Sequence, residues 1–256
     1  MYLRILAALS LCAVLALAVV TVWQSAQSTS AAPAPPIVAI SPGNHHTCAL
    51  TSEGGVKCWG RNQVGQLGNG STVNSGTPVN VTGLSTGVNA ISSNGDHNCA
   101  LTDTGGVKCW GYNQYGQLGN GESANYRTTP VDVSGLTSGV AAISAGSDHT
   151  CAVLTDGTGR CWGLNNYGQA GNNTSGNSWL GAVHVCASGT GFGCAGGSVL
   201  SGIARIAAGG LHTCAATTGG ALRFPTDAPP ATPARHGPAS PCWHGMTPVA
   251  RRMRSA

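Results

Sequence analysis

The sequence predicts an all-β protein built from repeated four-stranded units, and three observations support this prediction. Glycine accounts for 39 of the 256 residues, whereas charged side chains make up only 8% of the chain. This composition disfavours a helical bundle, because glycine destabilises helix interiors and the solvent-facing sides of bundle helices need charged residues. In addition, one short motif recurs four times, and β-type runs alternate with glycine-containing turns between its copies.

A His-x-Cys-Ala motif marks the internal repeat. Its successive cysteines are separated by 51, 52 and 63 residues and are Cys48, Cys99, Cys151 and Cys214. A β-type run precedes each copy, and in the first three copies a turn, a second run containing Cys-Trp-Gly, a loop and a closing run follow. Four strands in roughly 50 residues is the size of one β-propeller blade. The sequence therefore predicts an incomplete β-propeller of three full four-stranded blades plus half of a fourth.

The loop after Cys-Trp is rich in glycine and asparagine. Residues 60–70 recur as 111–121 and, with mild departures, as 163–172. The pattern Trp-Gly-x-Asn-x-x-Gly-Gln-Leu-Gly-x-Gly resembles the signature of the regulator of chromosome condensation repeat family, over about residues 37 to 223. The resemblance implies a β-propeller, usually of seven blades, whose loops bind other proteins.

The chain departs from this family in the number of its repeats, because Phe-Pro-Thr replaces the expected Cys-Trp-Gly after Arg223. Three and a half blades leave edge strands unpaired. Either the chain is a fragment with an altered end, which we favour, or self-association or another partner completes the propeller.

The ends of the chain differ from its middle. Residues 1–32 contain Arg4, a long apolar run and then small residues, which predicts a signal peptide. The run is long for this purpose, so a membrane anchor through residues 5–23 is the alternative. Residues 33–36 form a proline-rich linker. Residues 37–223 hold the repeats, and the Ala/Pro/Arg-rich residues 224–256 are predicted to be disordered.

The charge of the repeat region limits the classes of partner. Residues 37–223 carry seven basic and seven acidic side chains, so this region is neutral. A neutral surface lacks the positive patch that binds phosphate backbones, and we expect no nucleic-acid partner. Together with the export signal, the charge favours an extracellular or cell-surface protein.

Most of the cysteines are predicted to form disulfides. If Cys48 faces Cys58 across an antiparallel hairpin, a three-residue loop that ends in Gly54 remains, as such hairpins require. Directly opposed residues lie within disulfide reach, and disulfides persist in oxidising compartments. The predicted pairs are Cys48–Cys58, Cys99–Cys109, Cys151–Cys161 and Cys186–Cys194. Cys214 has three alternatives, namely pairing with Cys242, a free thiol and an intermolecular bridge.

The competing interpretation of the same cysteines is a metal site. His46, Cys48 and Cys58 offer three ligands that recur in each blade. However, the spacing is not the tight Cys-x2-Cys of structural zinc sites, and no fourth ligand recurs. We therefore expect no metal.

No motif for catalysis is present in the sequence. It lacks Gly-x-Ser-x-Gly, His-Glu-x-x-His and P-loop patterns, so we expect no enzymatic activity, no catalytic residues and no cofactor. Residues that recur once per unit are interpreted as structural. The histidines are expected to cap strands or bond backbone carbonyls, and the tryptophans to pack between blades; they are His46, His97, His149 and His212, with Trp59, Trp110 and Trp162.

Two positions in the loop carry different residue types in the three copies, while most of the residues around them recur. A repeat scaffold diversifies its binding face in this way, and tyrosine and arginine are favoured interface anchors. The alternative is simple tolerance of change in a loop. The predicted binding residues are Arg61, Val64, Tyr112, Tyr115, Leu164 and Tyr167.

These observations predict a secreted, disulfide-stabilised repeat scaffold that binds an extracellular protein or cell-surface ligand through its loops. Two other classes of function compete with it. The family resemblance implies guanine-nucleotide exchange or chromatin binding, which the export signal, the neutral repeats and the cysteines oppose. A lectin-like carbohydrate-binding module is the third class.

Overall fold

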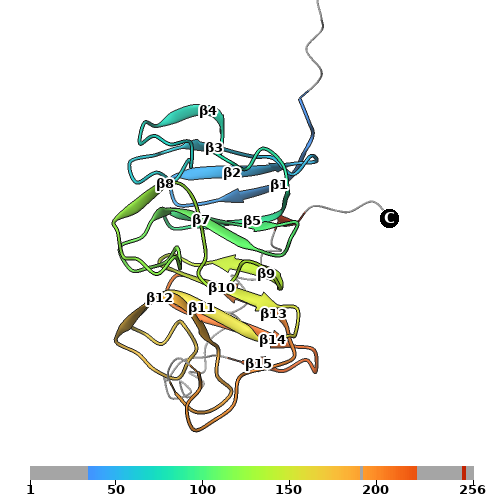
Figure 1. The fold of residues 1–256 in the computed structure, drawn as a ribbon, viewed down its shortest axis with the longest axis vertical. Coiled ribbons are helices and arrows are strands. Elements are labelled where there is room, and N and C mark those ends of the chain that lie inside the picture. The colour runs from blue at the N-terminus through green and yellow to red at the C-terminus, as the bar shows by residue number, and fades with distance from the viewer. Residues whose placement is uncertain (1–33, 191–192, 224–249, 252–256) are drawn as a thin grey trace, which may run out of the picture. The chain divides into compact units, whose positions relative to one another are not determined.

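A computed structural model describes residues 34–190, 193–223 and 250–251. These residues form four antiparallel sheets joined by turns and loops, in the order of the chain (Figure 1). The prediction of an all-β, incomplete propeller is therefore confirmed. Within the described ranges, no helix has the length and apolar character needed to cross a membrane. The predicted signal peptide or anchor lies outside the described residues, as does nearly all of the predicted disordered tail.

The first three sheets are complete blades with four strands each, in sequence order from the inner to the outer strand. The first blade contains β1 (Ile37–Pro42), β2 (His46–Thr51), β3 (Val56–Gly60) and β4 (Ser75–Asn80). The second contains β5 (Val88–Asn94), β6 (His97–Thr102), β7 (Val107–Tyr112) and β8 (Tyr126–Asp132). The third contains β9 (Val140–Ala145), β10 (His149–Leu154), β11 (Gly159–Asn165) and β12 (Asn177–His184).

The fourth sheet is only part of a blade. It contains β13 (Ile203–Ala208), β14 (Thr213–Thr217) and the two-residue β15 (Leu222–Arg223). A further two-residue strand, β16 (Ala250–Arg251), pairs antiparallel with β5 at the inner edge of the second blade. The inner strands β1, β5, β9 and β13 follow one another on one side of the stack of blades (Figure 1).

The hairpin between the second and third strands of each full blade has the predicted register. Cys99 lies directly opposite Cys109, with their Cα atoms 4.1 Å apart, and the two sulfur atoms form a disulfide. The loop between these strands ends at Gly105, whose φ of +79° is a left-handed conformation that glycine adopts without strain. The same pairing occurs in the other full blades as Cys48–Cys58 and Cys151–Cys161, and Cys186–Cys194 closes the insertion after the third blade.

Cys214 is also joined in a disulfide, so the free-thiol alternative is wrong, and only the identity of its partner stays a prediction. Cys214 is buried in β14, with 1% of its surface exposed. Its suggested partner, Cys242, lies outside the described residues.

Apolar side chains fill the space between successive blades. At the junction of the second and third blades, Leu118 and Val133 pack with Ile143 and Trp162 of the next blade, and all four are fully buried. Equivalent positions build the cores at the first and third junctions. The hydrophobic core therefore lies between blades, and each blade needs a neighbour to bury its apolar face.

The inner strand of the first blade shows the consequence of lacking a preceding blade. Ile40 in β1 is 59% exposed, whereas its counterparts in the next two blades, Ile91 and Ile143, are 1% and 0% exposed. Among the described residues, no blade packs on this face of β1. Self-association through this face stays a prediction.

Removing one blade disulfide should lower the stability of the whole structure. We expect the Cys99→Ala/Cys109→Ala double variant to lose about 2–3 kcal/mol of unfolding free energy, because the short cross-link no longer restricts the unfolded chain. Denaturant unfolding of the oxidised proteins measures this loss. Comparing the variant with the parent after both have been fully reduced isolates the contribution of side-chain packing, and equal stability of the oxidised parent and variant would contradict the expectation.

Candidate binding face

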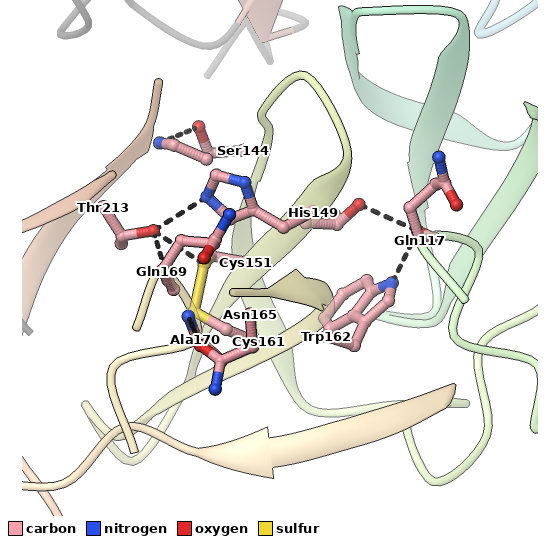
Figure 2. The surroundings of a disulfide bond; sticks show 12 residues. Gln117, Ser144, His149, Cys151, Cys161, Trp162, Asn165, Gln169, Ala170 and Thr213 are labelled. Carbon is pink, nitrogen blue, oxygen red and sulfur yellow. Dashed lines mark hydrogen bonds between the residues drawn. A yellow bond between two sulfur atoms is a disulfide. The ribbon is translucent and has the colours of Figure 1, made fainter. Parts of the chain in front are cut away.

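Adjacent blades are joined by a chain of buried hydrogen bonds. At the third junction, His149 Nε2 lies 2.9 Å from Thr213 Oγ1, and this hydroxyl donates to the Gln169 carbonyl oxygen at 2.7 Å (Figure 2). Since the hydroxyl proton is used on the carbonyl, the histidine must donate through Nε2. Burial lowers the pKa of His149 to about 4, so the ring is neutral near pH 7 and its single proton lies on Nε2.

The first two junctions repeat this arrangement. His97 Nε2 lies 2.9 Å from Thr150 Oγ1, which donates to the Gln117 carbonyl at 2.9 Å. At the first junction an asparagine replaces the threonine: Asn98 accepts from His46 at 2.7 Å and donates to a glutamine carbonyl at 2.8 Å. Three of the four repeated histidines, namely His46, His97 and His149, are structural, as predicted, and the Nε2 atom of each bonds a side chain of the next blade.

The tryptophans bind the same glutamine carbonyls. The indole nitrogen of Trp110 donates to Gln66 at 3.1 Å, and that of Trp162 donates to Gln117 at 2.9 Å (Figure 2). Both tryptophans are fully buried between blades, which confirms the predicted packing role. Trp59, in the first blade, is only half-buried, because no described blade precedes it.

The asparagine and glutamine of the loop signature hold the loop from within. The Asn62 side-chain oxygen accepts from the Leu67 amide at 2.8 Å, and the Gln66 side-chain oxygen accepts from the Val64 amide at 3.0 Å. The second and third loops repeat both bonds, and all of these asparagines and glutamines are fully buried. The loop backbone is thus fixed, while the side chains at the variable positions are free to differ.

The structure places the six predicted binding residues at the same end of their blades. Tyr167 is 62% exposed, and Tyr112 and Tyr115 are half-buried, with their rings edge to face and their centroids 6.2 Å apart. Arg61 and Val64 are also half-buried. Leu164 differs from the others.

Leu164 is only 8% exposed, and its backbone amide donates to the Asp148 carbonyl at 2.8 Å. Its side chain therefore lies in the interior rather than on the face. Sequence variation at a loop position does not distinguish a side chain that faces solvent from one that packs inward.

Two carboxylates on this face are absent from the predicted set. Asp96 accepts from the Gln66 side-chain amide at 3.2 Å, and Asp148 accepts from Gln117 at 3.3 Å, so each lies at the junction with the preceding blade. Arg61 adds an ion pair with Asp96 at 3.6 Å. Their sequence signal is their position immediately before a repeated histidine.

The third junction lacks such a carboxylate. Leu211 stands before His212 where the two preceding blades have aspartate, and it is 51% exposed. The side-chain nitrogen of Gln169, which corresponds to the donors at the other junctions, is buried without a hydrogen-bond partner. The arrangement on this face therefore changes from one junction to the next.

Burial controls the ionisation of the groups at the junctions. Burial lowers the pKa of His97 to about 3 and that of His149 to about 4. Burial, together with the negative charge of Asp96, raises the pKa of Asp148. Cys48 and Cys58 are joined in a disulfide, so their sulfur atoms are not thiolate ligands of a metal. The described residues contain no cluster of three or more His, Cys, Asp or Glu side chains suited to a metal.

Stacked antiparallel blades joined through repeated loops define a β-propeller repeat protein. Two family profiles, both described as "Regulator of chromosome condensation (RCC1) repeat", match residues 53–101 and 104–153, and residues 37–66, 88–117 and 140–169. Together they cover residues 37–169, which is 133 of the 256 residues. The chain belongs to the RCC1 repeat family.

Relatives with known names match only in part. The chain is 35% identical over 142 residues to the human "Probable E3 ubiquitin-protein ligase HERC4", a match that covers 54% of this chain and 13% of that protein. It is 33% identical over 132 residues to human "Protein RCC2", covering 51% of this chain and 25% of RCC2. The chain thus matches a quarter or less of the length of these relatives.

Solved structures show the same fold. Yeast RCC1 bound to Kap60 superposes with a TM-score of 0.62 at 23% identity, covering 76% of this chain and 44% of that one. Human WBSCR16 gives a TM-score of 0.59 at 24% identity, covering 72% and 46%. The described blades correspond to somewhat less than half of each of these chains.

The inter-blade hydrogen bonds should contribute to stability only where a preceding blade exists. We expect Thr150→Val to cost about 1–3 kcal/mol, because it leaves the buried His97 Nε2–H without an acceptor. Thr47→Val, at the same position of the first blade, should change stability by about 0.5 kcal/mol or less. Denaturant unfolding compares the two variants, and equal losses would contradict the role assigned to the junction.

Acid should destabilise the protein through its buried histidines. Their folded-state pKa lies below the ordinary 6.5, so the unfolded chain takes up protons that the folded chain excludes. Unfolding free energy should therefore be fully present above pH 6.5 and fall towards pH 4, by up to about 1.4 kcal/mol per pH unit for each histidine. Stability measured against pH should lose slope in His97→Gln and His149→Gln, but not in His45→Gln, which replaces an exposed histidine. An unchanged slope in all three would contradict this account.

Proposed function

We propose that this protein is an exported, non-enzymatic scaffold that binds a protein partner through the face formed by its repeated loops. One observation carries the proposal. In all three full blades, buried asparagine and glutamine side chains fix the loop backbone, while the side chains that differ between blades lie at one end. A rigid frame with variable exposed residues is how repeat proteins present a binding surface at low cost in conformational entropy.

The composition of the face suits a protein partner. It combines two tyrosines in ring contact, a third tyrosine that is 62% exposed, and charged groups of both signs. Tyrosine and arginine are enriched at the centres of protein interfaces. Solved RCC1 propellers also support this class of function, since yeast RCC1 was crystallised with Kap60 bound and the binding of Prp20p to Gsp1p and histones has been described.

The disulfides support an extracellular or cell-surface location. The structure has four disulfides among the described residues, with one in each complete blade. Stable structural disulfides are rare in reducing compartments. The amino-terminal sequence, with its basic residue and long apolar run, is the matching export signal or tether.

The alternative functions have less support in this chain. Nucleotide exchange and chromatin binding rest on resemblance to other members of the family, and the disulfides count against an intracellular site. The ligase name of HERC4 describes a protein of which the match covers 13%. A lectin-like function rests only on exposed tyrosines such as Tyr167, which serve a protein interface equally well.

Export can be tested with a reporter. We expect residues 1–36, fused to a reporter that is active only outside the cytosol, to give activity that is lost when the apolar run is interrupted by charged residues. The matched control is the same fusion without residues 1–36. A reporter that stays in the cytosol would revive the intracellular alternative.

Cross-linking in the native host tests the binding face. A photo-reactive amino acid at Val64, Tyr115 or Tyr167 should give discrete protein adducts. The same group at Thr104, in the exposed hairpin loop at the opposite end of the second blade, should give none. The measurement is mass-shifted bands and their mass-spectrometric composition. Adducts at Thr104 alone, or at no position, would refute the proposed face.

A further inference from the structure

The first two blade junctions share one arrangement on the binding face. At the first junction, the side chains of Gln66 and Arg61 both approach the carboxylate of Asp96, at 3.2 and 3.6 Å. At the second junction, Gln117 donates to Asp148 at 3.3 Å in the same way. The glutamine–aspartate hydrogen bond therefore occurs at both junctions. The first junction has one further group, the guanidinium of Arg61.

The second junction has no counterpart of this guanidinium. The residue that follows Cys-Trp-Gly is Arg61 in the first blade and Tyr112 in the second. Among the described residues, no lysine, arginine or histidine forms an ion pair with Asp148. The half-buried carboxylate of Asp148 thus lacks the cation that Asp96 has.

The electrostatics of the site agree with this geometry. Burial and the charge of Asp96 raise the pKa of Asp148, and no cation opposes them. Burial also raises the pKa of Tyr112, and the groups that add to the effect are Tyr115, Asp148 and Asp96. The geometric basis is the repeat itself, because Tyr112 has the position in the second blade that Arg61, the ion-pair partner of Asp96, has in the first.

Two aromatic rings stand in the second blade where the first blade has Arg61 and Val64. Tyr112 and Tyr115 meet edge to face, with an interplanar angle of 82°. The Tyr112 hydroxyl donates to the side chain of Gln114, just as the Arg61 guanidinium donates to Gln63 in the first blade. The ring is thus held where the arginine side chain lies at the first junction, and it offers a π-surface to a cation.

We infer that Asp148, Tyr112 and Tyr115 form a site for an arginine side chain of the protein partner, which supplies the cation that the second junction lacks. This inference rests on the proposed function, because it assumes a protein partner on this face. Guanidinium is the matching group, since its planar fork donates two hydrogen bonds to a carboxylate and its flat face stacks on aromatic rings. The site adds charge selectivity to a neutral scaffold.

The test is a nuclear magnetic resonance titration of the full chain with two capped tripeptides, Gly-Arg-Gly and Gly-citrulline-Gly. Citrulline has the shape of arginine without its charge. We expect the arginine peptide to bind weakly, with a dissociation constant of about a millimolar, because the charge pair and the contacts with the two tyrosine rings add together, and to shift the amide signals of residues 112, 115 and 148. The citrulline peptide should bind at least about fivefold more weakly.

Three variants define the site. Asp148→Asn should weaken arginine-peptide binding at least about fivefold. Tyr112→Arg copies the first junction within the chain, so it should also remove binding and lower the pKa of Asp148, which carbon-detected titration measures. Glu53→Gln removes an exposed carboxylate in the hairpin loop at the opposite end of the first blade and should leave binding unchanged. The amide spectrum of each variant reports whether it is folded.

The outcomes separate this inference from the proposed function. Equal binding of the two peptides, unchanged binding in Asp148→Asn, or no binding of the arginine peptide would each overturn the arginine site. None of these results affects the cross-links at Val64 and Tyr167, on which the proposed function depends. Loss of those cross-links with retained arginine-peptide binding would instead overturn the proposed protein-binding role.

Discussion

The hydrogen-bond chain from a histidine of one blade, through a threonine or asparagine of the next, to a glutamine carbonyl of the first fixes how the blades lie against each other. The histidine Nε2, the hydroxyl or amide of the next blade and the carbonyl oxygen are buried, and they satisfy one another within the junction. Because the accepting carbonyl belongs to the loop signature, the same bonds that hold two blades together also hold the loop in place. The tryptophan of the next blade binds the same carbonyl. Stability and the shape of the binding face therefore have a common origin.

Disulfides complement this arrangement at a different level. They join the two central strands of each blade, whereas the histidine chain joins one blade to the next. A chain with 39 glycines has a large conformational entropy when unfolded, and each covalent loop reduces that entropy. Each full blade is thus stabilised by a disulfide between two of its own strands and by hydrogen bonds with a neighbouring blade. On the face of β1 where no described blade packs, the apolar side chain of Ile40 remains exposed to solvent.

Repetition makes small differences between junctions informative. The three junctions have nearly identical buried hydrogen-bond networks, although the residues on their outer face differ. The identity of these outer residues is therefore not what maintains the fold. The first junction has a carboxylate with a guanidinium, the second a carboxylate without one, and the third neither. The arginine at the first junction is replaced by Tyr112 and the aspartate at the third by Leu211, while the supporting glutamines remain. This pattern agrees with the proposed binding role, in which the outer residues differ while the frame that supports them does not change.

The spacing of repeated residues in the sequence determines the blades, the hairpin register and the four disulfides between described cysteines. These features depend on local geometry: Cys99 and Cys109 are ten positions apart, and a three-residue loop ending in Gly105 places them opposite each other. Only the tertiary structure decided which residues of the loops face outward and which partners the histidines choose. Leu164 turns inward, and Asp148 joins the face from another blade, because both outcomes depend on the packing of segments that are distant in sequence. A single repeat does not contain the neighbour that completes its junction, and for this reason the site is a property of adjacent blades.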